Sequence, residues 1–390
     1  MASGTDHLDE LNRFYKKKVE FPPKQLEGHI NTANREVRKL LQEMRKLQQP
    51  GLEPVIADEF IPTGSSYEGL KVRGDMELDF MIPLFHPEFN FVPISHASVP
   101  GGYRQLKVER HKQLQRPEKV STPPSQFENK FTEGGYLIPS KVYHWFQSLV
   151  DQAMNNIRDL VRFDVKFTGY QPARTLVITL SPGNEICVDL VLAVYIGDGL
   201  YVVAKPLKIV PEQLLWRLSF SVFEKDILNQ LPSSSCHLKT LKILKYLREH
   251  DTRLEETSQF ASGICSYHLK TAFLHLLTHT NPTQWEDTAT NLNARLDELM
   301  DLLIQSMGKG ELNHFFLGNK SSLAKKVGAR SMKSEGVFNL FDPKFINETT
   351  LNQAKGRLVI IKHSLPAILK EHSSICVAKP RPTDQCSSFS

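Results

Sequence analysis

The chain has 390 residues, and 48 Lys and Arg stand against 43 Asp and Glu, which gives a formal net charge of +5 at pH 7. Because 40% of the residues are hydrophobic and 23% are charged, the composition excludes a disordered chain and is ordinary for a globular protein. No apolar run approaches about 18 residues and no secretory leader opens the chain, so we expect neither a membrane span nor export. The cysteines lack a paired spacing, which predicts reduced thiols in a cytoplasmic protein. The length predicts two domains or one bilobal unit.

Two helices are predicted at the beginning of the chain, over residues 8–19 and 24–47. In the second helix, apolar residues from Ile30 to Met44 recur at spacings of three and four, which is the pattern of a helix with one buried face. Its other face carries basic side chains, and Pro50 and Gly51 end it.

Strands predominate between residues 54 and 205. Short apolar or alternating runs, each bounded by Gly, Pro or Asn, predict strands in PVIADEFIP, MELDFMIPLF, RFDVKFTGY, RTLVITL, EICVDLVLAVYI and LYVVAK. One helix is predicted at 140–160. The polar stretch 115–135 contains three prolines, and we expect it to be a surface loop.

The pattern is helical again after residue 214, and the last helix is predicted over 351–371, where Pro366 should produce a kink. From residue 373 a disordered tail is expected. The predicted organisation is a mixed α+β fold with N-terminal helices that brace both lobes (1–52), a sheet-containing core (53–214), an all-helical lobe (215–372) and the tail (373–390).

Two acidic residues, Glu77 and Asp79, are separated by one residue in MELDF, so their side chains point to the same face of the predicted strand. Neighbouring carboxylates repel each other and lose hydration unless a cation lies between them. Mg²⁺ meets this requirement, because it prefers carboxylate, water and phosphate oxygens. The turn at Gly64 and Ser65 supplies backbone N–H groups and a hydroxyl suited to binding phosphates.

A third carboxylate, Asp189, lies within the apolar run EICVDLVLAVYI, where a lone aspartate would be costly. If this strand lies beside the one bearing Glu77 and Asp79, the three carboxylates converge on two metal ions that clamp an attacking hydroxyl and a leaving pyrophosphate. Two other interpretations stay open: a solvated strand edge for Glu77 and Asp79, and a cap or an arginine pair for Asp189. The order Gly-Ser, Glu-x-Asp and a later strand aspartate is typical of the nucleotidyltransferase (polymerase-β-like) superfamily.

Over about residues 55–317 the chain resembles the cyclic GMP-AMP synthase (cGAS)-like receptors, within the broader male-abnormal (Mab) domain nucleotidyltransferases. GSSYEGLKVRGDMELDF resembles the family's G-S-x-Y-E motif and its metal-binding strand, and WRLSFSVFEKDIL (216–228) resembles the segment that opens the helical lobe. LKILKYLRE and SYHLKTAFLHLL resemble two further core helices. The resemblance implies a bilobal nucleotidyltransferase fold.

The resemblance also implies roles for individual residues. Glu77, Asp79 and Asp189 would hold Mg²⁺, for which Mn²⁺ can substitute, and Asp189 would accept the proton of the attacking ribose hydroxyl. The implied nucleotide contacts are Gly64 and Ser65 to a triphosphate; Arg217, Ser219 and Ser221 to the acceptor base, with Glu224 and Lys225 on the same helix; Lys245 and Ser266 to the donor triphosphate; and Tyr267 stacked on a base. From the residues alone, a solvated Lys245 and a core Tyr267 stay open.

In one respect the chain departs from the vertebrate DNA-sensing members, which carry a zinc ribbon of one His and three Cys. The corresponding interval, NQLPSSSCHLKT, contains Cys236 next to His237 and no second cysteine nearby. His275 and His279 lie four residues apart with no further ligand evident. Four tetrahedral ligands cannot be assembled from these residues, so no zinc is expected.

Basic residues gather in three segments, one of them Lys16 to Lys18, and those in the other two predict contacts to the phosphates of a nucleic-acid duplex, although such runs are also common on solvated faces. They are Arg35, Arg38, Lys39, Arg45 and Lys46 in the long helix, and Lys325 and Lys326 in NKSSLAKKVGARSMK. The resemblance implies activation when a duplex contacts the long helix. Without a zinc ribbon, we favour double-stranded RNA over DNA, and whether monomers pair on the duplex stays open.

Together with the carboxylate pattern, the resemblance therefore implies a nucleic-acid-activated nucleotidyltransferase of innate antiviral defence. It would join two nucleoside triphosphates, such as ATP and GTP, into a cyclic dinucleotide that a STING-type receptor reads. Two other functions stay open: a catalytically silent Mab-type binding or scaffold protein, and a nucleotidyltransferase that extends an RNA end.

Overall fold

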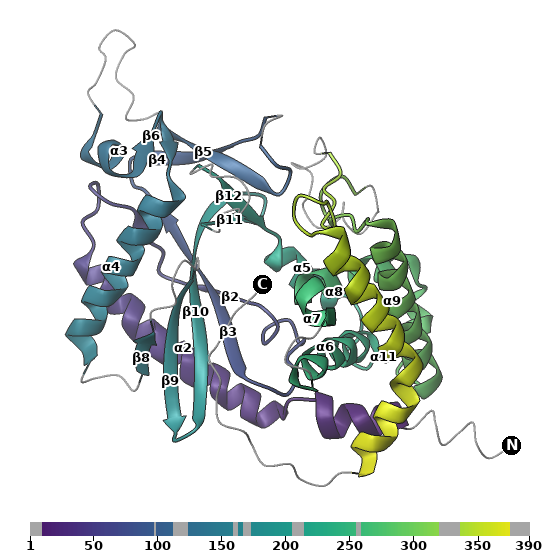
Figure 1. Ribbon diagram of the computed structural model, residues 1–390. Helices are drawn as coiled ribbons and strands as arrows, with labels where there is room; N and C mark the ends of the chain where they lie inside the picture. Colours follow the sequence, from purple (N-terminus) through teal and green to yellow (C-terminus); the bar gives the residue numbers. More distant parts are fainter. Residues whose placement is uncertain are drawn as a thin grey trace, which may run out of the picture. The chain divides into compact units, whose positions relative to one another are not determined.

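The computed structural model describes residues 10–96, 99–111, 124–158, 163–166, 173–204, 214–254, 259–319 and 336–374. The chain divides into two units (Figure 1). The sheet unit comprises residues 22–68 and 75–225, and the helical unit comprises residues 1–21, 69–74 and 226–390. The predicted mixed α+β class is confirmed.

The described strands lie in the sheet unit and join one sheet in the order β1-β3-β10-β11-β12-β5-β7-β6, with β2 on β3, β4 on β5, β9 on β10 and β8 on β9. Their bounds are β1 (Val55–Ile56), β2 (Ile61–Thr63), β3 (Met76–Phe85), β4 (Phe89–Ile94), β5 (Tyr103–Arg110), β6 (Thr132–Glu133), β7 (Tyr136–Leu137), β8 (Phe163–Lys166), β9 (Ala173–Ser181), β10 (Asn184–Gly197), β11 (Leu200–Val203) and β12 (Trp216–Ser219).

The centre of this sheet is the parallel pair β3 and β10. Parallel strands are usually covered by helices and rich in apolar residues, and here β3 is rich in Leu, Phe and Met and β10 in Val, Leu and Ile. Leu78 and Phe80 on β3 and Val188 and Leu190 on β10 are buried. Because side chains alternate along a strand, the residues between them point to the opposite face. That second face carries the acidic residues.

Helices α2 (Pro23–Leu47) and α4 (Pro139–Ile157) pack against each other, and α2 also contacts β10 (Figure 1). Both were predicted from their periodicity. The apolar stripe of α2 is buried, as Ala33, Val37 and Leu40 show no exposed surface. The aromatic ring of Phe80 lies 5.6 Å from that of Tyr67, whose hydroxyl donates a hydrogen bond to Asn34 on α2 over 3.1 Å. The Phe80 side of β3 therefore faces α2.

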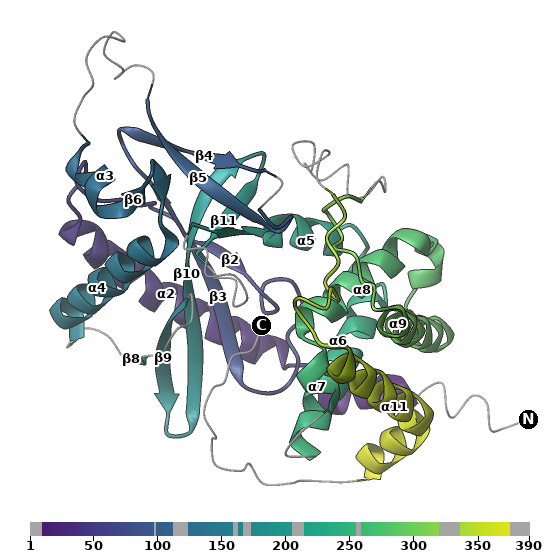
Figure 2. The same ribbon diagram turned by 45° about the horizontal axis from the view of Figure 1, so that its top comes forward.

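Two parts of the sheet unit differ from the sequence prediction. The stretch 115–135 is not a loop throughout, because residues 126–131 form α3 (Gln126–Phe131), followed by β6. Ser125 and Glu128 cap this helix reciprocally and Phe127 and Phe131 are buried, so capping and burial outweigh the polar composition. The hairpin of β4 and β5 (Figure 2) was not predicted, and its strand β5 pairs with β12.

The helical unit contains η1 (Tyr15–Val19), α6 (His237–Leu254), α7 (Gln259–Gly263), α8 (Ser266–His279), η4 (Pro282–Trp285), α9 (Ala289–Lys309) and α11 (Glu348–Ser374), and α5 (Ser221–Leu228) spans the boundary between the units. Pro366 lies inside α11, and its kink stays a prediction. Helices α7 and α11 pack closely at Gly263, because a Cβ added there would lie only 2.6 Å from the Cβ of Ala354. Residues 375–390 of the predicted tail lie outside the described residues.

The cap of α9 allows a first test of this fold. Thr288 accepts a hydrogen bond from the Asn291 N–H over 3.1 Å at the start of the 21-residue helix. Replacing it by Ala (T288A) should lower the free energy of unfolding by about 1 kcal/mol, because one N–H loses its partner. Urea denaturation monitored by circular dichroism measures this, and T288S is the control because Ser keeps the hydroxyl. An equal loss in T288S would contradict the cap.

Candidate active site

The carboxylates predicted to act together lie on neighbouring strands. In the parallel pair of β3 and β10, Asp79 is the register partner of Asp189 and Glu77 is the partner of Cys187. The predicted adjacency of the two strands is therefore confirmed. Glu77 is exposed and the other three are half-buried, whereas the residues between them are buried. One face of the sheet thus presents three carboxylates and a thiol.

The turn after β2 approaches this face closely. Gly64 has φ +77°, and a Cβ built there would lie only 2.0 Å from Oδ2 of Asp79. No side chain fits in that space, so only glycine permits the turn to lie against the carboxylate. The Ser66 hydroxyl donates to the Glu77 carbonyl oxygen over 2.9 Å, which ties the turn to β3. Ser65, half-buried, lies within this turn.

Two residues to which the sequence analysis gave no role interact with these carboxylates. Thr175 on β9 is the register partner of Asp189 and donates its hydroxyl proton to Oδ1 of Asp189 over 2.5 Å. Burial raises the pKa of Tyr67 above its ordinary value, and the negative charge of Asp79 raises it further. The alternation in RTLVITL could have indicated Thr175, but only the register of β9 on β10 identifies its partner.

The donor chemistry of this face fits a hard divalent cation, because carboxylate oxygens are the ligands that Mg²⁺ prefers. Within the described residues, no group of three or more His, Cys, Asp or Glu side chains is close enough together to hold a metal ion. Glu77, Asp79 and Asp189 share a face of the sheet. Their carboxylate oxygens would therefore have to turn toward one another to bind a cation.

Further along the same face lie three of the predicted base contacts. Arg217 and Ser219 alternate on β12, and Ser221 begins α5. The hydroxyls of Ser219 and Ser221 are 3.1 Å apart, and both lie within 3.8 Å of Sδ of Met81, two residues beyond Asp79 on β3. Met81 packs with Ala193 and Val203 in an apolar cluster. The sheet therefore carries an acidic area and a hydroxyl-bearing area with this cluster between them.

The remaining predicted nucleotide contacts are divided between the units. Glu224, which is buried, and Lys225, which is half-buried, lie on the part of α5 within the sheet unit. Lys245 on α6 belongs to the helical unit, where its Nζ lies 3.9 Å from Oε1 of Glu249. Ser266 and Tyr267 also belong to that unit and form the first turn of α8. Tyr267 is half-buried, and its hydroxyl lies 2.8 Å from Nε2 of His314.

The thiol preceding α8 was not singled out from the sequence. Burial acts to raise the pKa of Cys265, but the charge and the hydrogen bond of His268, together with backbone N–H groups, outweigh it and lower the pKa to about 6. Cys236, by contrast, is fully buried, and burial raises its pKa to about 11. The two thiols therefore differ in acidity.

The five basic residues predicted to bind nucleic acid on α2 have partners within the sheet unit. Nε of Arg35 lies 2.8 Å from Oε1 of Glu36, and Nζ of Lys39 lies 3.0 Å from Oε2 of the same residue. Burial alone would raise the pKa of Glu36, but these hydrogen bonds and charges outweigh it, so the pKa lies below its ordinary value.

The other three basic side chains of α2 are engaged similarly. Lys46 pairs with Glu43 over 2.8 Å, Arg45 donates to the Asp58 carbonyl oxygen over 2.7 Å, and Arg38 lies 5.6 Å from the centre of the Phe60 ring. Any duplex that binds α2 must therefore compete with these contacts. Lys325 and Lys326 lie outside the described residues.

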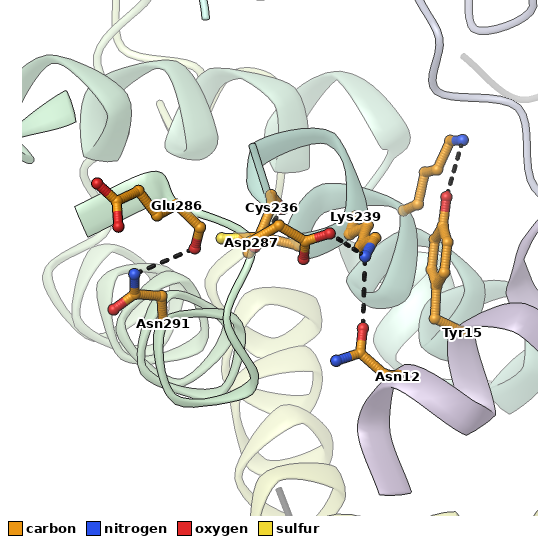
Figure 3. A network of polar contacts seen from close by, with 9 residues as sticks. Asn12, Tyr15, Cys236, Lys239, Glu286, Asp287 and Asn291 are labelled. Atoms are coloured by element: carbon orange, nitrogen blue, oxygen red, sulfur yellow. Dashed lines mark hydrogen bonds and ion pairs between the residues drawn. The ribbon is translucent and has the colours of Figure 1, made fainter. Parts of the chain in front are cut away.

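In the helical unit, a polar network surrounds the interval that was considered for zinc (Figure 3). Nζ of Lys239 contacts the carboxylate of Asp287 over 2.5 Å and Oδ1 of Asn12 over 3.4 Å. Cys236 lies beside this network (Figure 3). The neighbouring His237 has its Nε2 atom 2.9 Å from the Leu228 carbonyl oxygen. The network joins the N-terminal segment to α6.

His275 and His279 bond to backbone oxygens: Nε2 of His275 lies 2.7 Å from the Asn313 carbonyl oxygen, and Nδ1 of His279 lies 2.7 Å from that of His275. Both rings therefore have backbone partners. Among the described helices, none is long and apolar enough to cross a lipid bilayer.

Comparison with known proteins gives two family matches that follow each other along the chain. The Mab-21 protein nucleotidyltransferase domain matches residues 66–230, and the Mab-21 protein HhH/H2TH-like domain matches residues 236–334. The first match contains Glu77, Asp79 and Asp189, and the second contains Lys245, Ser266 and Tyr267.

Two kinds of curated protein are similar to the chain. Inositol 1,4,5-trisphosphate receptor-interacting protein of Homo sapiens is 29% identical over 386 residues, covering 89% of this chain and 69% of that protein. Cyclic GMP-AMP synthase of Mus musculus is 26% identical over 358 residues, covering 81% of this chain and 65% of that protein. The chain thus spans about two thirds of the length of these relatives.

The contact between Gly64 and Asp79 can be tested with a matched pair of variants. Gly183, in the turn between β9 and β10, also has φ +77°, but a Cβ there would meet no atom within 4 Å. G183A should lower the free energy of unfolding by about 1 kcal/mol through backbone strain. G64A should cost clearly more, because its Cβ displaces the Asp79 carboxylate as well. Urea denaturation compares the two, and equal losses would contradict a turn held against Asp79.

Proposed function

Because the chain belongs to the Mab-21 family of nucleotidyltransferase-domain proteins, we propose that it is a nucleotidyltransferase that joins two nucleoside triphosphates into a cyclic dinucleotide. The observation that carries this proposal is the alignment of Asp79 with Asp189 across the parallel pair, with Glu77 on the same face and the Gly64 turn against Asp79. A structural role would not require an acidic face next to a turn that excludes every side chain.

In this proposal Glu77, Asp79 and Asp189 hold Mg²⁺, or Mn²⁺ in its place. The bound cations would neutralise charge on the phosphates and on the leaving pyrophosphate. The ribose hydroxyl oxygen of one nucleotide forms a bond to the α-phosphorus of the other, and the bond from that phosphorus to the pyrophosphate oxygen breaks. Asp189 accepts the hydroxyl proton, and Thr175 holds the carboxylate in place. A second displacement of the same kind closes the ring.

The position of three polar side chains supports the base-binding part of the proposal. Arg217, Ser219 and Ser221 lie on the same face of the sheet unit as the carboxylates, beyond the cluster around Met81. Hydroxyls and a guanidinium in that position suit the acceptor sites of a base. Family resemblance extends the proposal further. Lys245 and Ser266 would contact the triphosphate, Tyr267 would stack on a base, and ATP and GTP would be the substrates.

Activation by double-stranded RNA, a cytoplasmic location and a STING-type reader of the product also belong to the proposal. Arg35, Arg38 and Lys39 on α2 are the basic side chains that a duplex would meet, with Arg45 and Lys46 near the end of the helix. Binding would exchange their carboxylate and carbonyl partners for phosphates. The affinity should therefore depend steeply on salt concentration.

A second candidate is a binding protein without catalysis. Two observations favour it: the human receptor-interacting protein is 29% identical to the chain, against 26% for the mouse synthase, and no metal-binding cluster is formed among the described residues. One assay separates the candidates. The full chain is incubated with all four ribonucleoside triphosphates and Mg²⁺, without nucleic acid, with duplex RNA or with duplex DNA, and the products are identified by mass.

A cyclic dinucleotide that appears only with one duplex supports the first proposal and identifies the activator. A polymer indicates extension of an RNA end. No product under any condition, with Mn²⁺ and several duplex lengths included, supports the binding protein.

The carboxylates give the sharpest prediction for catalysis. The double variant E77Q/D79N should reduce product at least about 100-fold, because the cation would lose two of its three ligands. Without metal its melting temperature should be equal to or above that of the unmodified chain, since neutral amides remove the repulsion among the carboxylates. E133Q, at an exposed position on β6, is the control. Undiminished synthesis in a correctly folded double variant would refute the metal site.

The ion pairs of α2 give a prediction for activation. E36Q should strengthen the binding of duplex RNA several-fold and steepen its salt dependence, because Arg35 and Lys39 lose their carboxylate partner. E27Q removes the same charge from an exposed position on the same helix and is the matched control. Fluorescence anisotropy of a labelled duplex at several salt concentrations measures both. If E36Q and E27Q behave alike, then α2 does not contact the duplex through these residues.

A further inference from the structure

Tyr267 has a specific partner within the helical unit. Its hydroxyl oxygen lies 2.8 Å from Nε2 of His314, and the centres of the two rings are 5.9 Å apart. His314 follows α9 and is 6% exposed, whereas Tyr267 is half-buried. A buried imidazole therefore contacts the hydroxyl end of a half-buried tyrosine side chain.

The backbone around His314 determines which ring nitrogen carries the proton. Nδ1 accepts hydrogen bonds from the backbone N–H groups of Phe316 and Leu317, over 3.1 and 3.3 Å. An acceptor nitrogen carries no proton, so in the neutral ring the proton is on Nε2. Nε2–H consequently donates to the Tyr267 hydroxyl oxygen. The two backbone N–H groups therefore determine the tautomer of His314 and, with it, the direction of this hydrogen bond.

His314 is itself fixed by the chain around it. Its backbone N–H donates to the Phe338 carbonyl oxygen over 2.8 Å, and the Leu340 N–H donates to that of Leu312 over the same distance. The side chain of Asn339 reinforces this pairing by accepting from the Leu312 N–H over 2.9 Å and donating to the Gly310 carbonyl oxygen over 2.8 Å. The imidazole is therefore attached to a paired stretch of backbone rather than to a single loop.

A tyrosine that stacks on a nucleobase binds more tightly if its ring is already in the bound orientation, because no side-chain freedom is then lost on binding. A hydrogen bond at the hydroxyl restrains the ring at the point most distant from the backbone. We propose that His314 is a positioning residue that holds the Tyr267 ring in the orientation for stacking on a nucleobase. This inference rests on the proposed function, since it takes Tyr267 to contact a nucleotide.

Two variants separate the positioning of Tyr267 from the support of the loop. The Oδ1 atom of Asn can replace Nδ1 as the acceptor of the two backbone N–H groups, but the side chain is too short to reach Tyr267. The amide of Gln can replace Nε2–H as the donor to Tyr267, but it leaves the loop without its acceptor. H314N therefore removes the tyrosine contact alone, and H314Q removes the loop contact alone.

The first readout is nucleotide affinity of the full chain, measured by calorimetry with Mg²⁺, duplex RNA and the α,β-methylene analogues of ATP and GTP, which cannot release pyrophosphate. H314N should weaken binding about 3- to 10-fold, the range that one hydrogen bond accounts for, and H314Q should bind within about 2-fold of the unmodified chain. In a Y267F background H314N should have no further effect. The melting temperatures should show the opposite order, because H314Q should melt at a lower temperature than H314N.

The second readout does not depend on nucleotide. The protein is labelled with 3-fluorotyrosine, and the resonance of Tyr267 is assigned by its absence in Y267F. This resonance should shift and broaden in H314N and stay near its original position in H314Q. An unchanged resonance in H314N, or an affinity that is normal in H314N and reduced in H314Q, would overturn the positioning role.

If the unmodified chain binds neither analogue, the proposed function fails and the stacking role fails with it. The fluorine spectra still decide whether His314 orients Tyr267. The two failures are thereby distinguishable.

Discussion

The parallel pairing of β3 with β10 is the constraint on which the candidate site depends. It aligns Asp79 with Asp189, two residues that are 110 positions apart in the chain, although their carboxylates repel each other when adjacent. Buried apolar side chains on the opposite face stabilise the pairing, because Leu78, Phe80, Val188 and Leu190 pack beneath the same strands. The hydrophobic face therefore provides the free energy that holds the acidic face together. A cation would reduce the repulsion, and the hydrogen bond from Thr175 already restrains one of the carboxylates.

Much of this arrangement could be predicted from the sequence where the signal is local. The alternation of MELDF and EICVDLVLAVYI identified both strands and their acidic residues, and the spacing in α2 identified a long helix within a residue of its observed ends. The hairpin of β4 and β5 and the short helix α3 were missed, because Pro, Ser and Lys in those stretches conceal the buried Phe89, Phe127 and Phe131. Local composition predicted solvent exposure there, and tertiary burial reversed it.

The contacts that give each candidate residue its surroundings could not be predicted, because they join distant segments. The space at Gly64 is limited by Asp79, Thr175 reaches Asp189 only through the register of β9, and Tyr267 meets His314 across 47 positions. The basic face of α2 provides a second example. The sequence shows five cations, whereas the structure shows that Glu36 and Glu43 on the same helix already bind three of them. A count of charges overestimates what such a helix offers to a polyanion.

The path of the chain has a consequence for its synthesis. Residues 10–21 belong to the helical unit, most of which lies beyond residue 225, and the chain enters the sheet unit twice in between. Lys239 contacts Asn12 and Lys242 contacts Tyr15, each across 227 positions. At a typical rate of translation, on the order of ten seconds or more must pass before the N-terminal segment can meet these lysines. Throughout that time the buried Phe14 lacks Tyr246 of α6, its aromatic partner, so part of the apolar N-terminal segment stays unpacked until α6 leaves the ribosome.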